Sequence, residues 1–205
     1  MRVRVFSSTG RYCASTVAAG VLLLLCAVFP VAADTGEAVN APSGNDAVAA
    51  MVARQEIEYL RRLYARATDL IGLNTAETIA EGRAIYRRIF TADAEILVTV
   101  QGEVTLSRKG PDGWVDVVIE ALGTTFTTTQ HMIGTQLVTI ERLPSAALSG
   151  EASMTSYLQA WHDAEGEVDT FIGTYHDKVR YTPELGWRIY YMNLEQVAHE
   201  IRKRP

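Results

Sequence analysis

The chain has 205 residues, of which 48% are apolar and 21% charged, a balance typical of one globular domain with a buried core. It carries 19 basic and 24 acidic residues, and the basic run Arg202–Arg204 stands at the C-terminal end. A protein that binds nucleic acid through its phosphates needs a basic face, so the composition argues against that class.

The first 33 residues have the three parts of a secretory signal peptide. Three arginines and no acidic residue precede an apolar run, Val17–Phe29, and Pro30 and three small residues follow it. The run is shorter than the roughly 20 residues of a membrane-spanning helix. We therefore predict cleavage after Ala33, export to the periplasm or the medium, and no membrane association of the mature chain.

Cleavage would change both the cysteine content and the charge. Both cysteines, Cys13 and Cys26, lie in the predicted signal peptide, so the mature chain would contain no disulfide. The same segment holds three basic residues and no acidic ones, and its removal gives a net charge of 16 − 24 = −8. The mature protein is therefore expected to be acidic and free of cysteine.

Helices are predicted in the first half of the mature chain. Residues 34–45 are small and polar and are interpreted as a linker. A capping residue at 45 or 46 opens a long helix that ends near Gly72, with Tyr64 on its apolar stripe. A second amphipathic helix is predicted over residues 77–90.

Strands dominate the rest of the chain. Residues 94–100 are rich in β-branched side chains and predict a strand, followed by a turn at Gln101 and Gly102 and a second short strand. A short helix over 114–122 follows, and Glu195–Arg204 is expected to be a final polar helix or tail. Long antiparallel strands are predicted at Thr127–Glu141, Ala152–Asp163, Phe171–Tyr181 and Trp187–Leu194.

Helices followed by a long antiparallel meander indicate an α+β fold, with one domain over residues 46–205. A curved sheet of this kind can wrap around the helices as a cone with an open end. The mouth of such a cone is a common place for a small-molecule pocket. We expect a mixed but mostly antiparallel sheet with the N-terminal helices packed inside it.

Acid–base side chains fall on several of these elements. The mature chain has four histidines, three of them on predicted strands, and Asp69 lies near the end of the first helix. A histidine beside a buried carboxylate can take a proton near neutral pH, and the hydroxyl of Tyr64 could hydrogen bond to a departing oxygen. Taken singly, each of these residues is more often structural. Because the spacing shows no His-x-His or His-x3-His pair, we predict no metal site.

Several strings resemble SnoaL-like proteins of the nuclear transport factor 2-like superfamily, in the branch of scytalone dehydratase and bile-acid dehydratase. They are YARATD at 64–69, IFTADA at 89–94, TQHMIG at 129–134, GTYHD at 173–177 and GWRI at 186–189, and the resemblance covers residues 46–194. It implies a cone-shaped α+β fold and chemistry without a cofactor.

The resemblance also assigns catalytic positions. His131 falls on an active-site histidine of the dehydratases, Asp69 on its partner aspartate and His162 on a second histidine. Tyr64, five residues before Asp69, is similar to the tyrosine of the bile-acid dehydratase branch. We expect these four residues to be catalytic.

Substrate-binding residues are carried over in the same way or from their apolar character. His176 falls where the scytalone enzyme has a pocket asparagine, and Val98 occupies the place of one of its two tyrosines. Trp114, Phe126 and Trp161 are expected to line the pocket with aromatic surface. His199 is expected at the surface.

Three functions remain open on these grounds. The first is a cofactor-independent lyase, of the dehydratase type, that acts on a small hydrophobic, aromatic or polycyclic substrate. The second is a carbon–carbon lyase that releases formaldehyde from a lignin-derived diol at the same site, and the third is a module that binds or assembles without catalysis. The resemblance implies a homotrimer or homodimer.

Overall fold

The computed structural model describes residues 44–204. The predicted signal peptide and all but the last two residues of the predicted linker lie outside this range. Gly44 and Asn45 are already helical, so the linker prediction extends too far at its C-terminal end. Within the described range, no helix is long and apolar enough to cross a membrane.

Two helices open the domain, close to the predicted bounds. α1 (Gly44–Gly72) buries one stripe that includes Ile57, Leu60 and Tyr64. α2 (Ala76–Ile89) begins with a capping box in which Thr75 and Thr78 satisfy each other's backbone N–H groups. The two helices approach closely at Gly82, where an added Cβ would lie 2.8 Å from the carbonyl oxygen of Ala67.

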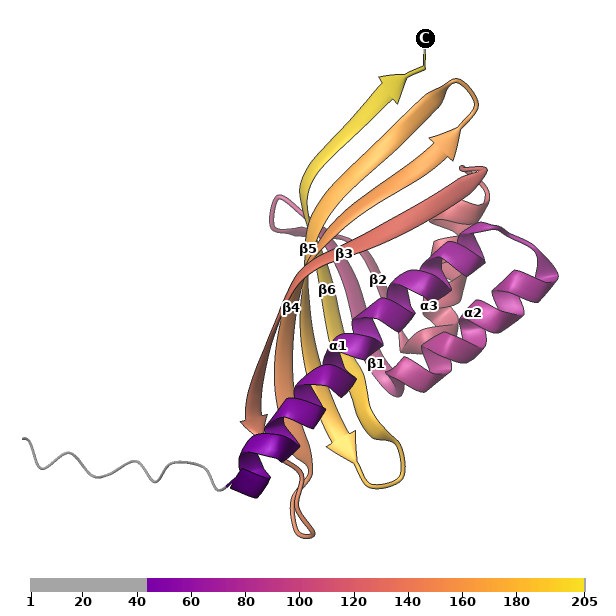
Figure 1. Ribbon diagram of the computed structural model, residues 1–205. Coiled ribbons are helices and arrows are strands. Elements are labelled where there is room, and N and C mark those ends of the chain that lie inside the picture. The colour runs from indigo at the N-terminus through magenta and orange to yellow at the C-terminus, as the bar shows by residue number, and fades with distance from the viewer. Residues whose placement is uncertain (1–43, 205) are drawn as a thin grey trace, which may run out of the picture. The chain divides into compact units, whose positions relative to one another are not determined.

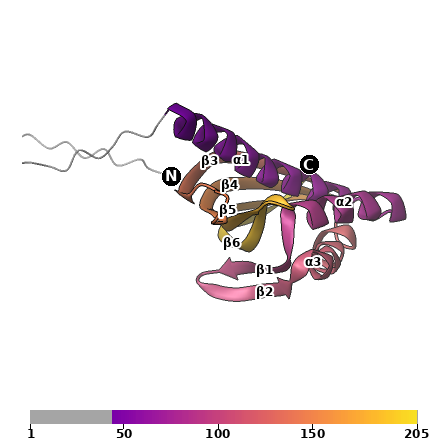
Figure 2. The ribbon, with the colours of Figure 1, turned by 90° about the horizontal axis from the view of Figure 1, so that it is seen from below.

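The six strands form one mixed, mostly antiparallel sheet, as predicted. They are β1 (Phe90–Val100), β2 (Glu103–Lys109), β3 (Thr128–Arg142), β4 (Gly150–Ala164), β5 (Glu167–Thr182) and β6 (Gly186–Lys203). Their order is β2-β1-β6-β5-β4-β3, and β1 and β6 run parallel while the other neighbours are antiparallel. The helices cover one face of this curved sheet, here called the concave face, and leave the opposite, convex face uncovered (Figures 1 and 2).

The short helical segment between β2 and β3 starts earlier than predicted and ends close to the predicted residue, but its last turn is π-helical instead of α-helical. α3 (Gly110–Val118) begins at a glycine with a φ of 76°, a left-handed conformation that favours glycine, and has Pro111 in its first turn. A π-helical turn, η1 (Ile119–Gly123), continues it. Together they close one end of the concave face.

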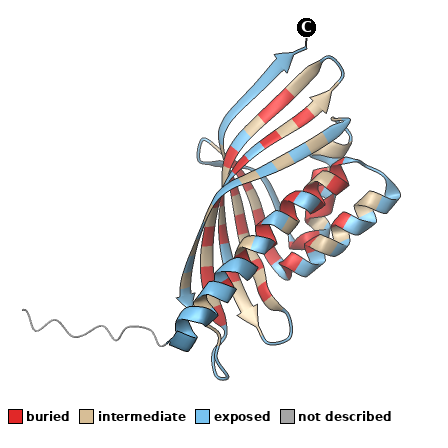
Figure 3. Cartoon of the chain, in the orientation of Figure 1, coloured by how far each residue is buried: buried red, intermediate tan, exposed pale blue. Residues whose placement is uncertain are grey.

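The prediction of a C-terminal helix or tail is wrong, because β6 continues to Lys203. Residues 199–203 pair with 167–171 of β5, which also begins earlier than predicted. From Val197 onward both faces of β6 are exposed, so the apolar alternation that identifies a strand is missing from this segment. Figure 3 shows this exposed end as a pale blue extension of the sheet.

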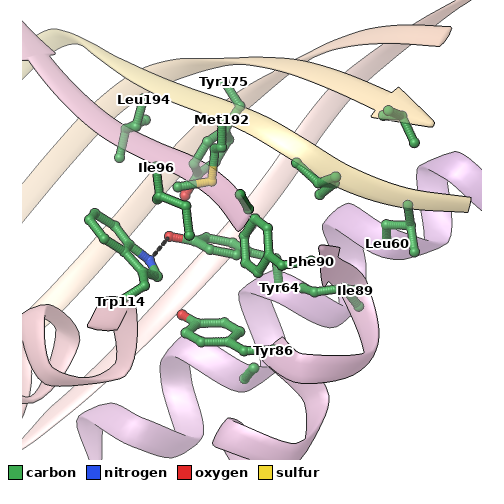
Figure 4. Packing of buried hydrophobic residues seen from close by; sticks show 14 of the residues in the cluster. Leu60, Tyr64, Tyr86, Ile89, Phe90, Ile96, Trp114, Tyr175, Met192 and Leu194 are labelled. Carbon is green, nitrogen blue, oxygen red and sulfur yellow. Dashed lines mark hydrogen bonds between the residues drawn. The ribbon is translucent and has the colours of Figure 1, made fainter. Parts of the chain in front are cut away.

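The core lies between the helices and the concave face. Tyr64, Tyr86 and Phe90 pack edge-to-face or stacked, and Figure 4 shows them among Met192, Ile96 and Trp114. At the centre, the fully buried Arg61 forms an ion pair with Asp177. Its guanidinium carbon lies 3.8 Å from the ring centroid of Tyr175 and 4.5 Å from that of Tyr64. One buried cation thus organises two aromatic rings.

Replacing Arg61 by methionine should destabilise the domain strongly. The variant leaves the Asp177 carboxylate buried without its partner, and such a loss costs about 3–5 kcal/mol. Urea unfolding followed by circular dichroism measures the change. In the double variant Arg61→Met, Asp177→Leu no buried charge is left alone, so most of the loss should be regained. A single variant as stable as the parent would contradict this account.

Candidate active site

The concave face holds a cavity of about 180 Å³ close to α3. Its lining is almost wholly apolar, and its polar members are contributed by α1, β3, β4 and β5. The lining residues are Tyr64, Thr68, Val98, Leu106, Trp114, Val117, Val118, Ala121, Leu122, His131, Leu158, Ala160, His162, Phe171, Tyr175 and Leu194. Two of the three predicted strand histidines therefore share one apolar pocket.

Asp69 and His131 meet at the wall of this cavity, as the sequence led us to expect. The Nδ1 of His131 lies 2.7 Å from the Oδ1 of Asp69, and the backbone N–H of His131 donates to the same carboxylate at 3.1 Å. Because the carboxylate only accepts, the imidazole carries its proton on Nδ1 and has Nε2 available as a base. Only 7% of the His131 side chain is exposed.

The close approach of α1 and β3 makes this contact possible. Gly72 lies one turn after Asp69, and a Cβ added to it would lie 2.3 Å from the Cγ2 of Thr129. A larger residue would push the end of the helix away from the strand. Gly72 is therefore part of the geometry that brings the carboxylate to the imidazole.

His162 is the second imidazole in the pocket. Its Nδ1 lies 2.8 Å from the hydroxyl of Thr129, its ring stacks on Phe126 at 4.8 Å, and its centroid is 5.7 Å from that of His131. Burial, followed by the nearby His131, lowers the pKa of His162 to about 4. The ring is therefore neutral at pH 7. It can donate an N–H hydrogen bond to a ligand, but it is not a protonated imidazolium that could act as a general acid.

Tyr64 presents its hydroxyl to the same cavity. The indole N–H of Trp114 donates to this oxygen at 3.1 Å (Figure 4). Thr68 donates its one hydroxyl proton to the backbone carbonyl of Tyr64, so the 2.6 Å contact between Thr68 and Tyr86 must use the proton of Tyr86. Burial raises the pKa of Tyr64 although Arg61 opposes the change. Tyr64 is thus a neutral phenol at physiological pH.

The predictions for the pocket lining divide into two groups. Val98 and Trp114 line the cavity, and Phe126 lies behind His162 instead of on the cavity surface. The prediction that Trp161 and His176 line the pocket is wrong, because both side chains lie on the convex face. Successive residues of a strand point to opposite faces, and the immediate neighbours of these two residues are the ones that face inward.

Sequence reasoning missed three functional candidates. Tyr175 and Phe171 line the cavity from β5. The expected surface residue His199 is exposed, but it lies 2.8 Å from the carboxylate of Asp169. The two-residue alternation of β5 could have identified Tyr175 and Phe171.

Within residues 44–204, no cluster of three or more His, Cys, Asp or Glu side chains could hold a metal ion.

Comparison with known proteins gives a consistent fold. The sequence profile of the SnoaL-like domain matches residues 49–193. A proposed scytalone dehydratase from Novosphingobium aromaticivorans is 20% identical, with a TM-score of 0.54 over 78% of this chain and 92% of that chain. A LinA-type3 hexachlorocyclohexane dehydrochlorinase from Novosphingobium barchaimii is 16% identical, with a TM-score of 0.59 over 76% and 94%.

A third similar structure is a nuclear transport factor 2-like superfamily protein from Salmonella enterica. It is 15% identical, with a TM-score of 0.51 over 73% of this chain and 94% of that chain. At these identities the likeness shows the fold alone. No curated protein matches the sequence.

The low pKa of His162 predicts a loss of stability in acid. In the unfolded chain the ring binds a proton below about pH 6.5, whereas the folded ring does so only near pH 4. Between these values the unfolded state binds more protons, so the free energy of unfolding falls as the pH is lowered, by about 2 kcal/mol between pH 7 and 4.5. The variant His162→Gln should lose this part of the pH dependence. Urea unfolding of both proteins at the two pH values measures it, and equal slopes would refute the assignment.

Proposed function

The chain belongs to the SnoaL-like domain family, and from that premise we propose that it is a cofactor-independent lyase of the dehydratase type, acting on a small hydrophobic, aromatic or polycyclic alcohol. The observation that carries the proposal is the pair Asp69–His131 at the wall of an apolar cavity. The similarity to a proposed dehydratase and to dehydrochlorinases supports an elimination reaction.

The proposed reaction begins with the free Nε2 of His131. It takes a proton from the carbon next to the one that bears the hydroxyl group. The electrons of that C–H bond form a double bond while the C–O bond breaks, and the proton held by His131 completes the departing water. Asp69 fixes the ring in the required tautomer and stabilises the imidazolium that forms.

Two further groups could assist the departing oxygen. Tyr64 is a neutral phenol whose oxygen already accepts from Trp114, so its own proton can be directed to a ligand. His162 is neutral at pH 7 and lies beside His131, with 5.7 Å between the two ring centroids. Hydrogen bonds of this kind are stronger in an apolar cavity than in water.

The lining supports the choice of substrate class. Apart from the two imidazoles, the polar groups among the cavity residues are the hydroxyls of Tyr64, Thr68 and Tyr175 and the indole N–H of Trp114, which is bonded to Tyr64. Burying an apolar ring in such a cavity is favourable by about 25 cal/mol per Å² of apolar surface removed from water. A charged ligand would lose its hydration without gaining a full charge partner. We therefore infer a neutral, hydrophobic substrate.

The test is turnover of hydroxylated aromatic and polycyclic alcohols by the purified chain, with products identified by mass spectrometry. Loss of water is the expected change. The variant His131→Ala should lower kcat/KM by about 10²–10⁴-fold because it removes the base. Asp69→Asn should also lower kcat, because the amide no longer holds the imidazole in the tautomer that leaves Nε2 free.

The matched control for these variants is His176→Ala. His176 is a strand histidine paired with Glu195 at 3.1 Å on the convex face, so its removal should leave turnover unchanged. Full activity of His131→Ala would overturn the proposed mechanism. Formaldehyde among the products would assign the deformylating reaction instead. Binding without turnover, unaffected by either site variant, would favour a module without catalysis.

We also propose that the chain forms a homodimer or homotrimer through the convex face. Exposed apolar side chains gather there around a shallow groove: Met132, Tyr157, Ile172 and Val197. Contiguous apolar surface of this kind is typical of a protein interface. Light scattering after size exclusion should give a mass of two or three chains, and Tyr157→Glu should reduce it to one. A monomeric parent protein would exclude this association.

A further inference from the structure

A second carboxylate–imidazole pair lies on the concave face, and the proposed elimination does not use it. The Nε2 of His199 on β6 lies 2.8 Å from the Oδ2 of Asp169 on β5. His199 comes from the C-terminal extension of β6, at the end of the sheet that extends beyond the helices (Figure 1).

Strand pairing places this second pair next to the cavity. Asp169 lies directly opposite His162 in the β4–β5 ladder, and His199 lies opposite Phe171 in the β5–β6 ladder. Phe171 lines the cavity, and its ring centroid is 6.5 Å from that of His199. Charges on Asp169 and His199 both influence the pKa of His162, which confirms that the groups are near one another. His131, His162, Asp169 and His199 thus follow one another across β3, β4, β5 and β6.

The burial of the second pair differs from that of an ordinary surface pair. The Asp169 side chain is 12% exposed and that of His199 is 41% exposed. In the pair of His176 and Glu195 on the convex face, the two side chains are 44% and 53% exposed. Asp169 is therefore largely buried, and it holds an imidazole that is partly exposed beside Phe171 of the cavity lining. The bond through Nε2 leaves Nδ1 of His199 available to a ligand.

The size of the cavity indicates that a ligand reaches this pair. A cavity of about 150 Å³ is enough for one benzene ring, and the cavity here measures about 180 Å³. Any substrate larger than one ring must extend from it along the concave face. The exposed Ile201 lies opposite Asp169 on β6 and offers apolar surface beside His199.

We propose that the Asp169–His199 pair is a second substrate-binding point, which holds a hydroxyl group at the end of the substrate opposite the eliminated one. The proposal rests on the proposed function and narrows it to an elongated aromatic or polycyclic diol. A hydroxyl suits this point because it can donate to Nδ1 of a neutral His199 and accept from Nδ1 of a protonated one. A carboxylate could bind only the protonated ring. His199 is a binding residue in this account and moves no proton.

The test compares two probes that differ by one hydroxyl, 4-hydroxybiphenyl and 4,4′-dihydroxybiphenyl. Trp114 lines the cavity, so quenching of tryptophan fluorescence reports binding of either compound. One hydroxyl can lie against His131, and the second then reaches toward His199. We expect the dihydroxy compound to bind about fivefold more tightly, as one additional hydrogen bond permits. In His199→Phe, which keeps an aromatic ring, this advantage should disappear.

Control variants separate the two binding points. His176→Ala should keep the full advantage of the second hydroxyl, since it lies on the opposite face. In His131→Ala the single hydroxyl of the monohydroxy compound can turn to His199 instead, so the two dissociation constants should become similar. Should His199→Phe fail to fold, the side-chain ¹⁵N signals of His199 in the parent protein give the same answer: they should shift with the dihydroxy compound and not with the monohydroxy one.

The outcomes distinguish this inference from the proposed function, because binding is measured without turnover. If no alcohol is dehydrated but the advantage of the second hydroxyl depends on His199, the binding point stands and the lyase proposal fails. If elimination occurs while the ratio of dissociation constants is the same in the parent and in His199→Phe, the binding point is wrong. Failure of both biphenyls to bind the parent protein would also overturn it.

Discussion

The site depends on one contact, the carboxylate of Asp69 held against both the backbone N–H and the ring of His131. This contact requires the last turn of α1 to lie directly on β3, and Gly72 permits that approach because no side chain separates it from Thr129. Thr129 in turn contacts the Nδ1 of His162. One close helix–strand junction therefore fixes the tautomer of the first imidazole and the surroundings of the second. A shift of this junction would disturb both histidines together.

The rest of the core keeps this junction rigid while leaving its polar groups in an apolar setting. Arg61 and Asp177 form a buried ion pair beneath the cavity, and the rings of Tyr64 and Tyr175 lie against the guanidinium. Such a pair adds little net stability compared with apolar residues, because removing two charges from water costs nearly as much as their attraction returns. Its effect is positional: it holds the two tyrosines that form part of the cavity wall.

The elements and the pairing of Asp69 with His131 could be predicted from the sequence, because periodicity and the string around His131 carry that information. Which side chains of each strand point toward the cavity could not be predicted as reliably from the sequence. Trp161 and His176 were expected in the pocket, but an error of one residue reverses the face of a strand residue. The Asp169–His199 pair was missed for a different reason. It depends on the pairing of the last residues of β6 with the start of β5, and that exposed segment lacks the apolar alternation of a strand.

The same alternation links the cavity to the convex face. Met132 follows His131, Tyr157 precedes Leu158 and Ile172 follows Phe171, so these three exposed apolar residues are chain neighbours of cavity residues. A partner that covered the convex face would hold these strands in register and would fix the directions of their inward side chains as well. Association of copies through this face would therefore act on the geometry of the imidazoles without contributing any residue to the site.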